Sequence, residues 1–529
     1  MANAKVIDRC PALKTELLPL RGCRCLPSDH CWPSTHEWDT FNRTVNGHLL
    51  QVKPVGSVCH GKEFDQVGCD DVKANTHDSV WRISEPGALQ WTNWEGDDRW
   101  GTCTINGAKK ALCKQGRLPL YKVMAQLAQE VQAAVQFAKR RNLHVAIRNT
   151  GHDGIGRSSG PGSVQINVSK LKQMRFMDEF TPQGGNESQG QAVTVGAGVL
   201  GMEVLEAGRR RGLNVITGTP SSLAATGGFL QGGGIGILSP AYGLAADNAL
   251  EFTLVTAEGN VVVANDFQNE DLFWALRGGG GGTFGVVLDT TIRTFPDVPA
   301  VYFWMTMTIP KRKRASLTAE QALWNITTEL TNLVPALKRF NDTASAIIFT
   351  RLLEVLDGRT LPYESNVTVY PRLSTYLSRP KTMDRAGYGL VESSVLVSEE
   401  LFYQPNGTST IMDVLSGLKF EVGDSVEILM TGGGQVKANK GIINTESMVK
   451  RMRNSQLPAL RSLESRYMGS YPNVADPDEP NYQRAFWGDN YPGLSQVKRY
   501  WDRDGLFTVR MGVNNEIWDS EGICRVKHP

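Results

Sequence analysis

The stretch RNTGHDGIGRS, residues 148–158, is the most informative segment of this chain of 529 residues. Two more glycine-rich stretches follow it: TGTPSSLAATGGFLQGGGIG at residues 217–236 and GGGGGTFGVV at residues 278–287. Clustered glycines permit positive φ angles and a close approach of backbone to a ligand. One such run alone would favour a tight turn. Three runs in one region indicate separate loops that bring backbone N–H groups to one shared ligand.

The first run has a spacing that also suggests a Rossmann dinucleotide site. That site requires the loop to open a helix whose N-terminus holds the pyrophosphate. Here Pro161-Gly162 and a β-rich segment follow instead. None of the runs ends in Gly-Lys-Ser/Thr, so a P-loop is also excluded. The loops are therefore expected to hold phosphate through concave arrays of amides.

Apolar periodicity predicts the elements around these loops. A helix is expected where Val123, Leu127, Val131, Ala134, Val135 and Ala138 recur, ending in the basic run 139–141. Further helices are expected at 201–211 and 269–277, strands at 143–148, 163–168, 192–198 and 213–216, and a hairpin formed by 250–257 and 260–264. Without a regular βαβ rhythm, the predicted class is α+β.

Four segments are predicted. Residues 1–114 form an irregular Cys-rich extension, 115–295 the glycine-rich domain, 296–469 an inserted mixed α/β domain, and 470–529 a segment that returns to the glycine-rich domain. Within the insertion, a helix is expected at 319–337 and strands at 345–354, 394–402 and 425–432.

At this point the loops resemble a known family. Residues 148–158 resemble the motif Arg-x-Gly-Gly-His-x-x-x-Gly-x-Ser of berberine-bridge-enzyme-like members of the vanillyl-alcohol oxidase family, with Thr150 in place of the first paired glycine. Residues 221–236, 282–287 and 487–507 resemble three further motifs of that family. The resemblance implies a two-lobed FAD-binding domain formed by both ends of the chain, with a substrate domain inserted between them.

The resemblance also implies the cofactor and its attachment. The matching histidine of the family bonds to the 8-methyl carbon of the flavin, which assigns this role to His152. Ser221 stands where bicovalent members carry a second linking cysteine, and a hydroxyl is too weak a nucleophile to replace it, so a single bond is expected. The other residues expected to bind FAD are Arg148, Asn149, Thr150, Gly151, Asp153, Gly154, Gly156, Ser158, Thr219, Ser221, Ser222, Thr226, Gly227, Gly228, Gly232, Gly233, Gly234, Gly236, Val286, Val287 and Asn473.

The catalytic base is harder to place. Many members use the second tyrosine of Tyr-x-Asn-Tyr-x-Asp, where this chain has Val474. Tyr471 corresponds to the other tyrosine and is a candidate, as is Glu427 in an expected strand, while Asp476 is expected to serve a turn. Residues 153–527 contain no histidine, so no transition-metal site is expected there.

The predicted function is a covalent-FAD oxidase that acts on an alcohol, phenol, sugar or secondary metabolite and returns electrons to O2 as H2O2. In the family, Leu or Ile at the position of Ala224 goes with slow reoxidation, so Ala224 predicts oxygen access. A dehydrogenase with another acceptor and a catalytically silent flavin-binding protein are the alternatives. Net charge +2 and the lack of an apolar run of 18 residues give no reason to expect nucleic acid or membrane partners.

Cysteines and sequons predict a secreted protein. Eight of the nine cysteines lie between residues 10 and 113, and the ninth is Cys524. This arrangement predicts a disulfide-stapled N-terminal segment with four bridges and one unpaired cysteine. Glycans are expected at some of Asn42, Asn186, Asn325, Asn341, Asn366 and Asn406, but not at Asn167 in an expected strand. The opening MANAKVIDRC has no apolar signal segment, which suggests removal of a signal.

Overall fold

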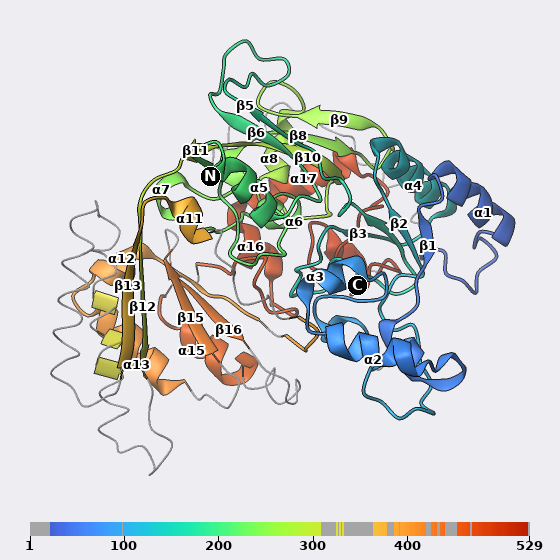
Figure 1. Cartoon of the computed structure of the whole chain (residues 1–529), viewed down its shortest axis with the longest axis horizontal. Helices are drawn as coiled ribbons and strands as arrows, with labels where there is room; N and C mark the ends of the chain where they lie inside the picture. The colour runs from blue at the N-terminus through green and yellow to red at the C-terminus, as the bar shows by residue number, and fades with distance from the viewer. Residues whose placement is uncertain are drawn as a thin grey trace.

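The computed structural model describes residues 22–97, 99–307, 324–325, 327–328, 331–332, 363–377, 386–390, 392–418, 425–430, 434–439, 452–465 and 468–526. Helices and strands are interspersed among them without a regular βαβ repeat, as the sequence predicts. Two sheets form the core of the glycine-rich region, residues 115–295, and smaller sheets form the inserted region, residues 296–469 (Figure 1).

The first sheet carries the first glycine loop at its edge. Its strand order is β1 (Leu49–Gln51), β2 (Tyr121–Met124), β4 (Val164–Asn167) and β3 (Val145–Arg148), and β4 lies parallel to both of its neighbours. Helices α1 (Thr35–Thr44) and α4 (Ala128–Arg141) share an apolar core with this sheet. Asn167 is fully buried in β4, which rules it out as an exposed glycan site.

The helix expected through Val123 is shorter than predicted. Val123 lies on β2, where it pairs with Ile166, and α4 begins only at Ala128 after the extended residue Leu127. The four-residue spacing between Val123 and Leu127 suits a helix, but it occurs here by coincidence. Pairing of β2 with β4 makes Val123 part of a strand. The end of α4 is as expected, since Asn142 at φ +51° stops it after the basic run.

The second sheet is antiparallel throughout. Its strand order is β5 (Met174–Met177), β6 (Ala192–Gly196), β10 (Val286–Arg293), β8 (Ala249–Val255) and β9 (Val261–Ala264), which confirms the predicted β8–β9 hairpin. Helices α5 (Gly201–Arg209) and α8 (Glu270–Leu276) pack on it. Between them lie β7 (Leu213–Asn214), α6 (Gly228–Gln231) and α7 (Ser239–Tyr242), with β7 paired to β11 (Phe295–Pro296).

The N-terminal extension is more regular than predicted. Besides α1 it contains α2 (Gln66–Asn75) and α3 (Ser79–Ser84), and the side chains of Ser34, Asp65 and Asp78 cap the three helices. Four disulfides are present, as predicted: Cys25–Cys31, Cys59–Cys69, Cys103–Cys113 and Cys23–Cys524. Cys10, the remaining cysteine, lies outside the described residues.

The described part of the inserted region contains two small sheets. One pairs β12 (Ala300–Met307) with β13 (Tyr363–Tyr370), and the other has the order β14 (Leu396–Val397), β16 (Gly434–Asn439), β15 (Ser425–Met430). Its helices are α11 (Leu373–Leu377), α12 (Glu399–Tyr403), α13 (Gly407–Gly417) and α15 (Leu457–Arg461). The strand expected at 394–402 is therefore wrong beyond residue 397, because Ser398 caps a helix there. Most of 319–337 and all of 345–354 lie outside the described residues.

The end of the chain returns to the glycine-rich region. Helix α17 (Tyr491–Trp501) contacts α8 and α16 (Tyr482–Trp487), and Trp487 and Leu494 belong to the core of the second sheet (Figure 1). Buried Lys498 of α17 donates to the backbone oxygen of Thr283 at 2.6 Å. In the described part of the chain, no helix is long and apolar enough to cross a bilayer.

Candidate active site

The three glycine runs meet in space. Nε2 of His152 in the first loop lies 2.6 Å from Oγ of Ser222 in the second. A Cβ placed on Gly281 of the third loop would lie 2.7 Å from Cα of Gly228 in the second, so these backbones nearly touch. Gly280 also donates its N–H to the backbone oxygen of Gln231 at 3.0 Å. The predicted convergence of the loops is therefore present.

The first loop leaves β3 at Arg148 and turns sharply at Gly151. Gly151 has φ +82°, and a Cβ there would lie 2.8 Å from Nε of Arg148. Thr150, where the family motif has glycine, has no positive φ and is free to carry a side chain. Asp153 closes the turn by accepting from the N–H of Ser158 at 2.6 Å.

Arg148 anchors this loop to the N-terminal extension. Its guanidinium is fully buried and donates to the backbone oxygens of Ala88 at 2.6 Å and Arg82 at 3.0 Å. Burial lowers the pKa of Arg148 to about 10, with a smaller lowering from nearby Arg82. Arg82 itself pairs with Glu95 at 3.0 Å. Arg148 thus fixes the start of the first loop through hydrogen bonds to the backbone of the N-terminal extension.

Trp91 and Trp94 of the extension cover the same loop. The rings of Trp91 and His152 meet edge to face, with 6.2 Å between centroids. Nε1 of Trp94 donates to the backbone oxygen of Gly154 at 3.0 Å, and a Cβ on Gly156 would collide with the Trp94 ring at 2.5 Å. The missing side chain at Gly156 therefore allows Trp94 to pack closely on the loop.

In the second loop, glycines make room for side chains of other segments. Gly227 has φ +88°, and a Cβ on it would lie 2.8 Å from Nδ2 of Asn149. A Cβ on Gly232 would lie 2.2 Å from Oδ1 of Asn473. Asn473 also donates to the backbone oxygen of Phe229 at 3.0 Å and so ties the C-terminal segment to this loop. Gly233, Gly234 and Gly236 follow directly, while Thr219 is exposed and Ser221 half-buried.

Buried polar atoms around the loops test whether a polar cofactor fits. Within the part of the chain that the structure describes, the buried polar atoms at these loops without a hydrogen-bond partner include Nε of Arg148, Oδ1 of Asn149, Oγ1 of Thr217, Oγ1 of Thr226, Oε1 of Gln231 and Oγ1 of Thr283. Unpaired buried polar groups are costly, and their gathering at the glycine loops indicates a polar ligand that pairs with them. The residues present therefore fit FAD.

Three residues that the sequence predicted for the site are buried where backbones pack closely together: Val286 and Val287, expected to bind FAD, and Ala224, expected to give oxygen access. Val286 and Val287 begin β10, pair with Val255 and Leu254, and bury their side chains in the core. Ala224 is buried and forms a β-bridge with Leu200. A small residue at 224 thus lets two backbones approach.

A cavity of about 1180 Å³ lies between the glycine-rich and inserted regions. Its walls include Gly232, Gly233, Ile235, Trp274, Leu396, Leu401, Tyr403, Met468, Tyr471 and Trp487. Three of these, Gly232, Gly233 and Ile235, come from the second glycine loop. The cavity therefore joins the candidate cofactor site to the inserted region.

Tyr471 lies in the wall of this cavity. Its hydroxyl accepts from the backbone N–H groups of Gly234 at 3.2 Å and Ile235 at 3.4 Å, and from Nδ2 of Asn473 at 2.9 Å. Burial raises the pKa of Tyr471 above its usual value, although these hydrogen bonds oppose the shift. The hydroxyl therefore remains protonated at neutral pH.

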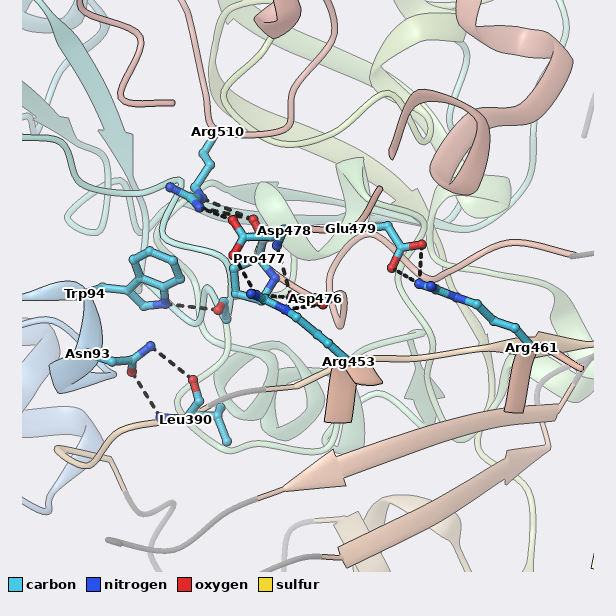
Figure 2. A network of polar contacts seen from close by, with 11 residues as sticks. Asn93, Trp94, Leu390, Arg453, Arg461, Asp476, Pro477, Asp478, Glu479 and Arg510 are labelled. Atoms are coloured by element: carbon cyan, nitrogen blue, oxygen red, sulfur yellow. Dashed lines mark hydrogen bonds and ion pairs between the residues drawn. The ribbon is translucent and has the colours of Figure 1, made fainter. Parts of the chain in front are cut away.

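The acidic candidates take different positions. Glu427 lies on β15 opposite Lys437, and its side chain is outside the described residues. Asp476 forms a turn, as expected, because it accepts from the N–H of Asp478, but its buried carboxylate also pairs with Arg453 (Figure 2).

Sequence reasoning missed Glu392. Its side chain is 7% exposed, and its Oε2 would lie 3.0 Å from a Cβ on Gly154. Paired hydrogen bonds between Asn93 and Leu390 hold this segment beside the first loop (Figure 2). No local motif marks Glu392, since the contact depends on how distant segments meet.

Known proteins resemble this chain over nearly its whole length. A family model described as FAD binding domain matches residues 119–265, and one described as berberine and berberine like matches residues 470–514. Flavin-dependent oxygenase ucdF of Aspergillus ustus is 58% identical over 540 residues, which cover 93% of this chain and 99% of that protein. FAD-linked oxidoreductase malF of Malbranchea aurantiaca is 38% identical over 552 residues, with 95% and 94% covered.

A solved structure shows the same fold. The VAO-type flavoprotein MtVAO615 of Myceliophthora thermophila C1 superposes with a TM-score of 0.83 at 28% identity, covering 95% of this chain and all of that one. The convergent loops, the polar atoms that fit a cofactor and these relatives agree with the resemblance seen in the sequence. The chain therefore belongs to the FAD-linked oxidoreductases of the vanillyl-alcohol-oxidase type that carry a berberine-bridge-like C-terminal segment.

Proposed function

We propose that this protein is a secreted oxidase that holds FAD by a single covalent bond to His152 and oxidises a small alcohol, phenol, sugar or other secondary metabolite. The observation that carries the proposal is the position of His152, which meets Ser222 where the first two glycine loops converge. A single bond is favoured because residues 114–523 contain no cysteine and Ser221 occupies the position of the second link.

FAD held at these loops would supply a hydride acceptor for the substrate, and O2 is the proposed final electron acceptor. The chain binds and orients the cofactor through the glycine loops and the unpaired polar atoms of residues such as Asn149, Thr226 and Thr283. The rest of the predicted set, including Val286, Val287 and Asn473, would shape the site by packing and by tying segments together.

The substrate would occupy the cavity between the two regions. We assign Tyr471 to orientation of the substrate, because its protonated hydroxyl can donate to a substrate oxygen at the cavity wall. Glu392 is our candidate for the proton acceptor, since its buried carboxylate reaches the loop of His152 from the inserted region. Glu392→Gln should lower kcat strongly at unchanged flavin content.

O2 is favoured as the electron acceptor. The relative with 58% identity is named a flavin-dependent oxygenase, a class of enzyme that handles O2. Ala224 is smaller than the Leu or Ile that goes with slow reoxidation in this family. The same relative supports a second candidate function, an oxygenase that places one oxygen atom in the product.

A secreted location is supported by four disulfides and by exposed sequons. Asn186, Asn325, Asn366 and Asn406 are exposed. Asn42 is half-buried on α1 and accepts a hydrogen bond from the N–H of Leu49, so it is the least suited to carry a glycan. Asn341 lies outside the described residues.

The test is reoxidation kinetics. The flavin is reduced without air and mixed with O2 in a stopped-flow instrument, and H2O2 is counted per product formed. An oxidase should reoxidise rapidly, give one H2O2 per product, and slow down in Ala224→Leu. Slow reoxidation that Ala224→Leu leaves unchanged would point to a dehydrogenase instead. Oxygen from ¹⁸O2 in the product would identify an oxygenase.

A further inference from the structure

Three buried side chains connect His152 to the N-terminal extension. Nε2 of His152 lies 2.6 Å from Oγ of Ser222, which lies 2.7 Å from Oγ of Ser79. Ser79 in turn donates to Oε1 of Gln90 at 2.8 Å. Ser79 is 2% exposed, and Ser222 and Gln90 are fully buried. We call Ser222, Ser79 and Gln90 the serine chain.

The direction of every hydrogen bond in the serine chain is fixed by Gln90. Its Nε2 donates to the backbone oxygen of Ser79 at 2.9 Å, and a carbonyl only accepts, so Oε1 must face the Ser79 hydroxyl. Because Ser79 has one hydroxyl proton and gives it to Gln90, it must accept from Ser222. Ser222 then has no further proton to give and must accept from His152.

We propose that the serine chain holds His152 with its proton on Nε2 and so prepares Nδ1 as the atom that bonds to the flavin. The hydrogen bond at one ring nitrogen sets the protonation of the other, so an Nε2–H ring carries its lone pair on Nδ1. The inference rests on the proposed covalent attachment. The N-terminal extension thus has a role at the site. It supplies Ser79 and Gln90 as positioning residues, and Trp91, whose ring packs against the imidazole ring of His152.

The attachment balances with O2 as the oxidant. A bond forms between Nδ1 of His152 and the 8-methyl carbon of FAD, and one C–H bond of that methyl group breaks. The proton leaves to solvent, and the electron pair stays on the cofactor until O2 removes two electrons, which with two protons become H2O2. Nε2 keeps its proton because Ser222 still accepts from it, so the linked ring is positively charged.

The experiment measures attachment separately from binding. Wild type, Ser222→Ala, Ser79→Ala and Ser222→Thr are incubated with excess FAD and air, and samples are precipitated with acid over time. Flavin in the pellet gives the covalent fraction, and flavin retained by gel filtration before precipitation gives total binding. Ser163→Ala is the matched control, because Ser163 is a fully buried serine whose hydroxyl donates to the backbone oxygen of Gly160.

Ser79→Ala should bind FAD and attach it about tenfold more slowly than wild type, and Ser222→Ala should attach whatever FAD it binds about tenfold more slowly. Ser222→Thr, which keeps the hydroxyl, should recover the rate, and Ser163→Ala should match wild type. Attachment at the wild-type rate in both alanine variants would overturn the inference, as would loss of total flavin binding in both, which would show a packing role. A wild-type protein without covalent flavin would instead refute the proposed attachment itself.

Discussion

Gly151 cannot carry a side chain without strain, since its φ is +82° and a Cβ would lie 2.8 Å from Nε of Arg148. Gly151→Ala should therefore destabilise the fold by about 1–3 kcal/mol and displace the His152 loop. The expected result is less flavin per polypeptide, measured by absorbance, and a lower urea midpoint.

The neighbouring position provides the control for this prediction. Thr150 has no positive φ, so Thr150→Gly should keep the loop conformation and reduce flavin per polypeptide less than Gly151→Ala does. Stoichiometric flavin and an unchanged urea midpoint in Gly151→Ala would contradict the role given to Gly151.

His144 makes stability depend on pH. It is buried, its Nδ1 donates to the backbone oxygen of Pro161 at 3.1 Å, and desolvation lowers its pKa to about 4. Its contribution is fully present above the unfolded pKa of about 6.5 and is lost as the pH falls toward 4, because the unfolded chain then binds the extra proton. We expect a loss of roughly 3 kcal/mol over this window, measured by urea unfolding.

A His144→Gln variant tests the assignment, since glutamine does not titrate. Its stability should vary less between pH 6.5 and 4 than that of the wild type. An equally steep loss in both proteins would place the acid sensitivity elsewhere.

Some residues of the candidate site could be predicted from the sequence, and others could not. His152 and Gly151 stand in one contiguous motif, so local spacing was enough to find them. Ser79, Gln90 and Glu392 reach the same loop from distant segments, and their residue types are ordinary on protein surfaces. Only tertiary packing brings them to the site.

At the scale of elements, two arginines join the helices of the inserted region to the C-terminal segment (Figure 2). Arg453 bonds both carboxylate oxygens of Asp476, and Arg461 bonds both of Glu479 at 2.7 Å. The side chains of Asp476 and Glu479 are each 1% exposed. Because Tyr471 lies near the start of this segment, the pairs also hold the cavity wall in place.

Arg453→Ala should cost about 2–4 kcal/mol, because it leaves the buried carboxylate of Asp476 without its partner. Replacing the carboxylate as well, in Arg453→Ala/Asp476→Asn, should recover part of this loss. Thermal unfolding of the single and double variants measures both effects. A double variant that is less stable than Arg453→Ala would show that the pair is not coupled as described.

Sequence periodicity predicted most elements of the glycine-rich region and, in the insertion, strand β15. The hairpin β8–β9 and helix α8 were found because their apolar patterns are regular. Val123 was misassigned because a four-residue spacing to Leu127 also occurs across a strand and the start of a helix. Apolar residues 395–397 suggested that the strand continues, but the cap at Ser398 ends it.

At the scale of the whole molecule, Cys23–Cys524 joins residues 501 positions apart and so links the two ends of the chain. Cys103–Cys113 closes a much shorter loop, with a separation of 10. A longer closed loop restricts the unfolded chain more. Cys23→Ser/Cys524→Ser should therefore cost about 5 kcal/mol, against about 3 for Cys103→Ser/Cys113→Ser, measured by urea unfolding. An equal or smaller loss for the long bridge would contradict this ranking.

The return of the C-terminal segment to the glycine-rich region was predictable only through the family resemblance. The cysteine count predicted four bridges in all but could not reveal that Cys524 pairs with Cys23, because spacing alone does not determine connectivity. Strand order likewise depends on contacts between distant segments, as in the pairing of β6 with β10.

The central claim, FAD held by one bond to His152, is tested most directly by acid precipitation followed by peptide mass analysis. We expect the yellow colour to stay with the denatured polypeptide and one tryptic peptide, containing His152, to carry the flavin mass. In His152→Ala the flavin should appear in the supernatant. Free FAD released from the unmutated protein, or a second flavin crosslink within residues 217–236, would contradict a single covalent bond at His152.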